Sequence, residues 1–263
     1  MRKLEQIKKD SFIQVDIIWF DNDLIVTYNK YAILIYCHLS KHISKRNEFI
    51  FTLNYIYSLL NIPINDPTRQ NQIKSVLSEM QEDKLILLSD VDFKKLKCSE
   101  LVMIQTYEIK DQFIMLYDFE FDTIMDYKEK VDKSKLLAIF LYIKKCINQT
   151  TKVAFPSYDT LCEVCGIGSH HTVKTYIDIL KDLGLLLYHS RDAKVYKDGE
   201  IRKFNNVYAM NYEGYQTYID KYNEIQDEKE QEYYDKQNKK KEANKKRSAK
   251  MKKNFTELDE LIE

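Results

Sequence analysis

Glycine and proline are scarce in this sequence: its 263 residues include only 5 Gly and 3 Pro. Such a composition disfavours an all-β fold, which needs many turns, and favours helices. Long apolar runs are missing as well, and none approaches the ~18 residues of a membrane span. The first residues, MRKLEQIKKDSF, lack the apolar segment of a secretory signal. From the missing signal and the missing membrane span we expect a cytoplasmic protein without a membrane partner. The abundance of Lys, Ile, Asn and Tyr suggests a low-GC bacterial source or one of its mobile elements.

Net charge is also absent, since 41 basic residues balance 41 acidic ones. Many DNA-binding proteins are basic overall, so the position of the charges matters more here than their sum. The 5 Cys are scattered and odd in number, which indicates free thiols in a reducing compartment. No Gly-rich phosphate loop, His-Glu-x-x-His or Gly-x-Ser-x-Gly motif occurs. We therefore predict that the chain is not an enzyme and needs no cofactor.

The sequence contains an internal repeat. Residues 73–88 (IKSVLSEMQEDKLILL) are echoed by residues 173–188 (VKTYIDILKDLGLLLY). In both copies an amphipathic helix is followed almost directly by a short apolar strand. Hydrophobic residues make up 44% of the chain, which is enough for each copy to bury a core.

The same order of elements is expected in each copy. An extended segment precedes an apolar helix, a short β-prone piece, two further helices and a hairpin. The expected ranges are 12–18, 31–39, 49–51, 52–62, 68–83, 85–88 and 101–104 in the first copy, and 116–121, 135–143, 153–155, 157–167, 169–183, 185–188 and 207–210 in the second. Thr52, Ser157 and Asp66, the last followed by Pro67, are predicted helix N-caps, and Gly184 a C-cap.

This order is that of a winged helix, in which a helix-turn-helix is followed by a β hairpin. We predict a mainly α fold with small β wings, in the α+β class. Two tandem winged helix-turn-helix domains would occupy residues 1–118 and 119–212. A charged tail, helical or disordered, would follow at 213–263.

Polar and basic side chains at the start of each third helix, and in each hairpin loop, are the candidate DNA contacts. Such side chains donate to phosphates or to base edges in the major groove, and hairpin cations follow the backbone or the minor groove. An exposed helix start or a basic loop is by itself usually only a solvated surface, and the repetition of both is what favours DNA. In the first copy the candidates are Thr68, Arg69, Gln70, Asn71, Gln72, Lys74, Lys94, Lys95 and Lys97. In the second they are Ser169, His170, His171, Lys174, Thr175, Arg191, Lys194, Lys197, Arg202 and Lys203, with Asp198-Gly199 as the expected hairpin tip.

Cys162-x-x-Cys165, which precedes His170 and His171, is a candidate zinc site. The spacing is not that of a standard finger and no second ligand pair is evident. Structural thiols are the favoured interpretation, and no metal is predicted.

The tail changes composition along its length. Residues 224–235 are mostly acidic and residues 236–253 are dense in Lys and Arg. Residues 254–263 are acidic again, but keep Phe255, Leu258, Leu261 and Ile262 at helical spacing. This end of the chain is a candidate docking segment for a partner protein.

Residues 119–210 resemble the winged-helix domain of replication proteins from Gram-positive plasmids and phages. The resemblance rests on Phe155-Pro156-Ser157 with Thr160-Leu161, and on Thr172-Val173 with Ile177, Leu180, Leu183, Gly184 and Leu185. The first copy is a more divergent match to the N-terminal domain of RepA-like and DnaD-like initiators. The resemblance implies a tandem winged-helix initiator or organiser of replication that binds double-stranded DNA at repeated origin sites. A helicase or its loader would bind the tail, and a homodimer is conceivable.

Other functions remain open at this point. The same fold would serve a transcriptional regulator, or an accessory protein of DNA segregation or of a relaxosome. A protein-interaction scaffold is a third hypothesis, which the polar and mildly basic helix faces disfavour. The sequence alone separates replication from regulation poorly.

Overall fold

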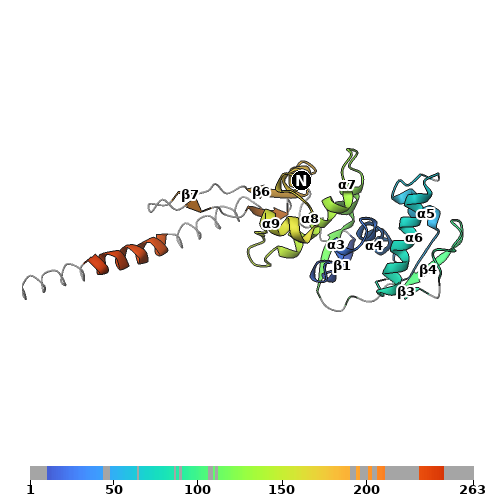
Figure 1. Cartoon of the computed structure of the whole chain (residues 1–263), viewed down its shortest axis with the longest axis horizontal. Coiled ribbons are helices and arrows are strands. Elements are labelled where there is room, and N and C mark those ends of the chain that lie inside the picture. Colours follow the sequence, from blue (N-terminus) through green and yellow to red (C-terminus); the bar gives the residue numbers. More distant parts are fainter. Residues whose placement is uncertain are drawn as a thin grey trace, which may run out of the picture. The chain divides into compact units, whose positions relative to one another are not determined.

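The computed structural model describes residues 11–43, 48–63, 65–85, 87–88, 91–105, 109, 112–189, 194–195, 201–202, 206–210 and 231–245 (Figure 1). Residues Met1–Tyr215 form one compact unit and Gln216–Glu263 a second one. In the second unit, residues 231–245 are a helix whose side chains are almost all exposed. The tail's last residues and the Asp198-Gly199 tip lie outside the described residues.

The first copy has three principal helices and a small antiparallel sheet in the strand order β2-β4-β3. This is the order expected of a winged helix. Its elements are β1 (Phe12–Asp16), α2 (Ile18–Asp21), α3 (Leu24–Thr27), α4 (Tyr31–Lys41), β2 (Glu48–Phe51), α5 (Leu53–Leu59), α6 (Pro67–Glu82), β3 (Leu87–Leu88) and β4 (Val102–Gln105).

The second copy repeats this order with a longer hairpin, in which β6 pairs with β9 and β7 with β8. The piece predicted at 153–155 is reduced to one bridge, between Ala154 and Tyr208. Its elements are β5 (Phe113–Tyr117), α7 (Asp118–Met125), α8 (Lys133–Cys146), α9 (Tyr158–Val164), α10 (His170–Asp182), β6 (Leu186–His189), β7 (Lys194–Val195), β8 (Ile201–Arg202) and β9 (Val207–Met210). The α+β class with small antiparallel sheets is confirmed.

Helices begin at the predicted caps. The Thr52 hydroxyl accepts from the N–H of Tyr55 at 3.2 Å, and that of Ser157 accepts from Thr160 at 3.0 Å. Asp66 accepts from the N–H of Arg69 at 3.0 Å, with Pro67 as the first helical residue. Each bond satisfies a backbone donor that has no partner within its helix.

The extended segment predicted at 116–121 is wrong from residue 118 onward, because α7 begins at Asp118. The Glu120 carboxylate turns back and accepts from the N–H of Tyr117 at 2.9 Å. Asp118 and Glu120 also place negative charge at the positive end of the helix. The strand therefore ends at Tyr117, four residues before the predicted end at residue 121.

The leading strands of the two copies pair with each other. β1 and β5 are antiparallel, with Phe12 opposite Tyr117 and Asp16 opposite Phe113. Ile13, Val15 and Leu116 on the inner face of this sheet are buried in a hydrophobic core that extends through both copies. Both copies therefore belong to one compact unit, and their division into separate domains at residues 118 and 119 stays a prediction.

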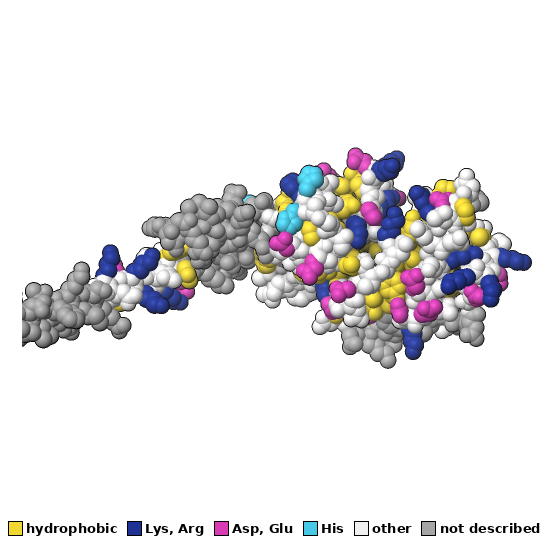
Figure 2. Space-filling model, viewed as in Figure 1, with side chains coloured by type: hydrophobic (Ala, Val, Ile, Leu, Met, Phe, Trp, Pro, Cys, Tyr) yellow, Lys and Arg dark blue, Asp and Glu magenta, His cyan; other side chains and the backbone are white. Residues whose placement is uncertain are grey.

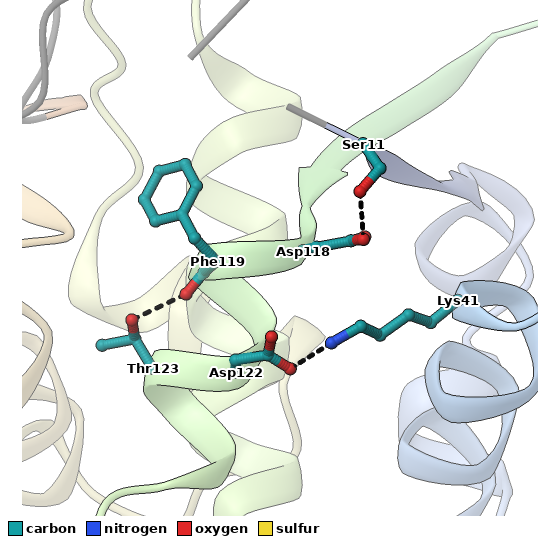
Figure 3. A network of polar contacts seen from close by, with 6 residues as sticks. All are labelled: Ser11, Lys41, Asp118, Phe119, Asp122 and Thr123. Carbon is teal, nitrogen blue, oxygen red and sulfur yellow. Dashed lines mark hydrogen bonds and ion pairs between the residues drawn. The ribbon is translucent and has the colours of Figure 1, made fainter. Parts of the chain in front are cut away.

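Polar contacts also join the copies beside this sheet. Asp118 accepts from the Ser11 hydroxyl, and Asp122 forms an ion pair with Lys41 of α4 (Figure 3). Lys145 of α8 pairs with Asp21 of α2. These ion pairs tie α7 to α4 and α8 to α2.

The turn after the third helix has the same backbone form in both copies. Gly184 has a φ of 71° and Lys84, at the equivalent position, a φ of 59°. In each case the next N–H reaches back to the helix, from Leu185 to Leu180 at 3.0 Å and from Leu85 to Met80 at 2.8 Å. Gly184 is the predicted C-cap, whereas Lys84 adopts the left-handed conformation at a steric cost.

We expect Gly184→Ala to lower the free energy of unfolding by about 1 kcal/mol, because a Cβ is strained at this φ. Lys84→Gly should leave stability unchanged or raise it slightly, since strain relief offsets the greater freedom of the unfolded glycine. Urea unfolding of both variants and the parent chain measures this. A Gly184→Ala variant as stable as the parent would contradict it.

His38 lies at the contact between the copies. Its ring packs edge-on against Phe121 of α7, with centroids 4.8 Å apart. Within the described residues its Nε2 is buried without a hydrogen-bond partner. Burial, followed by the nearby His42 and Lys41, lowers the pKa of His38 from 6.5 to about 4. The ring is therefore neutral at pH 7.

The unfolded chain binds a proton at His38 below about pH 6.5, whereas the folded chain resists it until about pH 4. The free energy of unfolding should therefore decrease as the pH is lowered through this window, by roughly 2 kcal/mol between about pH 7 and pH 5. Urea unfolding at the two pH values tests this. His38→Gln should remove that part of the loss and the exposed-site control His171→Gln should not; equal losses in all three chains would refute the assignment.

Candidate nucleic-acid interface

Helices α9 and α10 form a compact helix-turn-helix. The turn contains Gly166, with a φ of 60°, and Ile167, whose N–H donates to the Cys162 carbonyl at 2.8 Å. Lys135 of α8 donates to the Cys165 carbonyl at 2.8 Å and fixes the turn on the helix beneath it. Ser169 then caps α10, its hydroxyl accepting from the N–H of Thr172 at 3.2 Å.

One face of α10 is buried and the opposite face is exposed. Val173, Ile177 and Leu180 lie fully in the core. The five residues predicted to face DNA from this helix are all exposed: Ser169, His170, His171, Lys174 and Thr175. Burial of the apolar face holds the helix while its first two turns stay accessible.

Several of these side chains already have partners. His170 Nε2 lies 2.7 Å from Asp159 Oδ1 of α9, and its ring meets that of Tyr158. The Thr175 hydroxyl donates to the His171 carbonyl at 3.0 Å. Ser169 serves as the cap, so its role is to orient the helix start, where backbone N–H groups and the helix dipole favour an anion.

Lys174 belongs to a network that links α10 to the wing. Its ammonium lies 2.7 Å from Asp178, and Asp178 also accepts from the Tyr188 hydroxyl of β6 at 2.9 Å. Partial burial tends to raise the pKa of Asp178, but hydrogen bonds from Lys174 and Tyr188 hold it below its ordinary value. The same bond raises the pKa of Lys174. Asp178 stays ionised and competes with any phosphate for this lysine.

In the first copy, more of the polar side chains at the start of the equivalent helix, α6, are bonded to other groups of the protein. Arg69 pairs with its own cap, Asp66, at 3.2 Å, and the Gln70 amide donates to the Pro63 carbonyl at 3.3 Å. Lys74 is half-buried and donates to the Leu96 carbonyl at 2.9 Å. Thr68, Asn71 and Gln72 are exposed. The basic groups of α6 thus contribute to holding its own copy together.

The loop between β3 and β4 departs from the predicted polar wing. Phe93 and Leu96 are buried, and the Cys98 carbonyl accepts from the N–H of Asn54 in α5 at 3.0 Å. This loop packs on the helices because two apolar residues lie among its lysines. Lys94, Lys95 and Lys97 remain exposed, with Lys95 3.0 Å from Asp92.

The wing of the second copy is a longer antiparallel ribbon. Lys194 lies opposite Arg202 in the pairing of β7 with β8. Arg191, Lys197 and Lys203 lie outside the described residues. The ribbon carries cationic residues on both of its strands, as a wing that follows a phosphate backbone would.

Sequence reasoning missed the acidic and aromatic partners of α10, which are Tyr158, Asp159, Asp178 and Tyr188. The spacing of Lys174 and Asp178, four residues apart in a helix, was a signal that could have revealed their pairing. No local signal joins Asp159 to His170, because they lie on different helices. On the face shown in Figure 2, basic and acidic side chains are interspersed over the described residues.

The cysteines near α10 do not gather with other ligands. Cys165 is buried, which raises the pKa of its thiol to about 12, and Cys162 is half-buried. Within the described part of the chain, no three His, Cys, Asp or Glu side chains come together as a metal site would require.

Residues 133–186 match the helix-turn-helix domain family. The match runs from the start of α8 to the first residue of β6 and so includes α9, the turn and α10. This domain supports DNA binding by the second copy. Comparison with curated proteins and with solved structures gives no match. No helix among the described residues has the length and apolarity to cross a membrane.

We expect Asp178→Asn to raise affinity for duplex DNA of unrelated sequence about two- to fivefold, because an exposed ion pair holds Lys174 by only ~0.2–1 kcal/mol. The Asn oxygen can still accept from Tyr188. Fluorescence anisotropy across a salt series measures the effect, and the steeper salt dependence of the variant should accompany it. Unchanged affinity would show that Lys174 does not meet the phosphates.

Proposed function

We propose that this chain is a sequence-specific binding protein for double-stranded DNA in the bacterial cytoplasm, with α10 as its recognition helix. The exposed start of α10, within a segment that matches the helix-turn-helix family, carries the proposal. Its N-terminal N–H groups would meet a phosphate, and His171 and Lys174 would donate to base edges or phosphates in the major groove.

The wing of the second copy would add backbone contacts through Lys194 and Arg202, and through Arg191, Lys197 and Lys203. The first copy would make a weaker contact through Thr68, Asn71 and Gln72 of α6, because Arg69 and Lys74 are engaged within the protein. Two linked modules would favour repeated DNA sites, since binding of one raises the effective concentration of the other.

We further propose that the DNA is a replication origin of a plasmid, phage or integrated element, whose replication the protein initiates or organises. The resemblance of residues 119–210 to winged helices of replication proteins supports this role. A helicase or loader would bind the tail. The second candidate is a transcriptional regulator or an accessory protein of a relaxosome or of segregation, which the helix-turn-helix match favours equally. Binding to short repeats beside the coding region supports the first, and binding at a promoter or transfer origin the second.

We expect Lys174→Ala and His171→Ala each to weaken binding to the cognate duplex by about 1–3 kcal/mol, because each removes a donor from the recognition helix. The matched control Lys128→Ala, at an exposed lysine between α7 and α8, should change affinity less than about twofold. Anisotropy with duplex from the DNA beside the coding region, and with scrambled duplex, measures this. Equal binding to both duplexes by the parent chain would refute sequence-specific recognition.

A further inference from the structure

Strand β5 has an edge that β1 does not use. The Asp118 N–H donates to the Ser11 carbonyl at 3.0 Å, so these residues are a hydrogen-bonded pair of the ladder. In an antiparallel ladder such pairs alternate with unbonded ones. Ile13 with Leu116 is therefore bonded, whereas Gln14 with Met115, and Asp16 with Phe113, are not.

Two contacts agree with this alternation. The N–H of Tyr117 donates to the Glu120 carboxylate at 2.9 Å and not to β1. The carbonyl of Gln14 accepts from the Tyr36 hydroxyl at 3.3 Å and not from β5. The backbone N–H and C=O groups of Phe113 and Met115 consequently face away from β1, and among the described residues they have no partner there.

This edge opens into a groove. One wall consists of Phe113, Ile114, Met115 and Tyr117 of β5. Across from it lie residues from the end of α8 and beyond, with Met210 at the end of β9. The lining residues on this side are Lys144, Lys145, Ile147, Gln149, Lys152 and Met210. Successive side chains of β5 point to opposite faces of the sheet, yet residues of both faces line this groove. This is expected where a groove follows the edge of a strand.

The lining combines apolar side chains with cations. Phe113 and Met115 are each 36% exposed, and the exposed ring of Phe12 stacks on that of Phe113 with centroids 6.3 Å apart. Among the described residues, three lysines line the groove and no Asp or Glu does. The carboxylates that pair with Lys144 and Lys145, from Glu120 and Asp21, are not among the lining residues.

We propose that an extended segment of another protein, alternating apolar and acidic side chains, binds this groove by adding a strand to β5. Its backbone would bond to Phe113 and Met115, as in known strand-addition complexes. Side chains on one face would lie beside Phe113 and Met115, while those on the other face would approach the lysines. The inference does not depend on DNA binding.

The chemistry of the groove decides against two other occupants. A second copy paired through β5 would bring the two sets of lysines toward each other, and like charges in contact oppose association. A nucleic-acid strand has no alternating N–H and C=O groups that could pair with the open edge of β5.

The test is fluorescence anisotropy of the full chain with a labelled, capped octapeptide that alternates Val and Glu. We expect saturable binding, and at least about tenfold weaker binding of the same peptide with every backbone nitrogen methylated, because methylation removes the donors for strand pairing. Absence of binding, or equal binding of the two peptides, would overturn the proposal. Displacement of the peptide by a single-stranded oligonucleotide at equal concentration would overturn it in favour of nucleic acid.

A charge variant locates the site. Lys152→Glu should weaken peptide binding several-fold, whereas the matched control Lys128→Glu, at an exposed lysine outside the groove, should leave it unchanged. Equal urea unfolding midpoints for both variants and the parent chain would show that the fold is kept. An equal loss of binding in the two variants would refute the assignment to this groove.

Discussion

The antiparallel pairing of β1 with β5 is the constraint on which the first unit depends. It brings together residues about a hundred positions apart and buries their apolar inner face against helices of both copies. A two-stranded sheet is only marginally stable alone, so its stability comes from this packing. The unit therefore has one core and not two, although the sequence repeats.

The two copies share an order of elements and differ in how they use charge. In the first, Lys74 holds the β3–β4 loop and Arg69 pairs with its cap, so the cations of α6 stabilise the copy itself. In the second, Lys174 of α10 pairs with Asp178 at the surface. Because a surface ion pair exchanges readily with a phosphate, the second copy is the better suited to DNA.

Local rules predicted most of the elements, because caps, periodicity and the glycine turn act within a few residues. Thr52, Ser157, Asp66 and Gly184 all have their predicted roles. Those rules could not predict contacts between residues that are distant in the sequence. The β1–β5 register and the hydrogen bond from Lys74 to Leu96 are of this kind, because they depend on the tertiary fold. The exposed face of α10 was predicted, but the acids that restrain His170 and Lys174 were found only in the structure.

The three acidic residues of α7 show how a short helix can fix the geometry between copies. Asp118, Glu120 and Asp122 bind Ser11, Lys144 and Lys41, which belong to three different elements or their flanks. Burial raises the pKa of Glu120, although Lys144, 2.5 Å away, opposes this. A buried pair of this kind adds little net stability, since desolvation offsets the attraction, but it penalises any arrangement that separates the partners. Lys144 lines the groove beside β5, so the same ion pair that orients α7 on α8 also sets the position of one cation at the open edge.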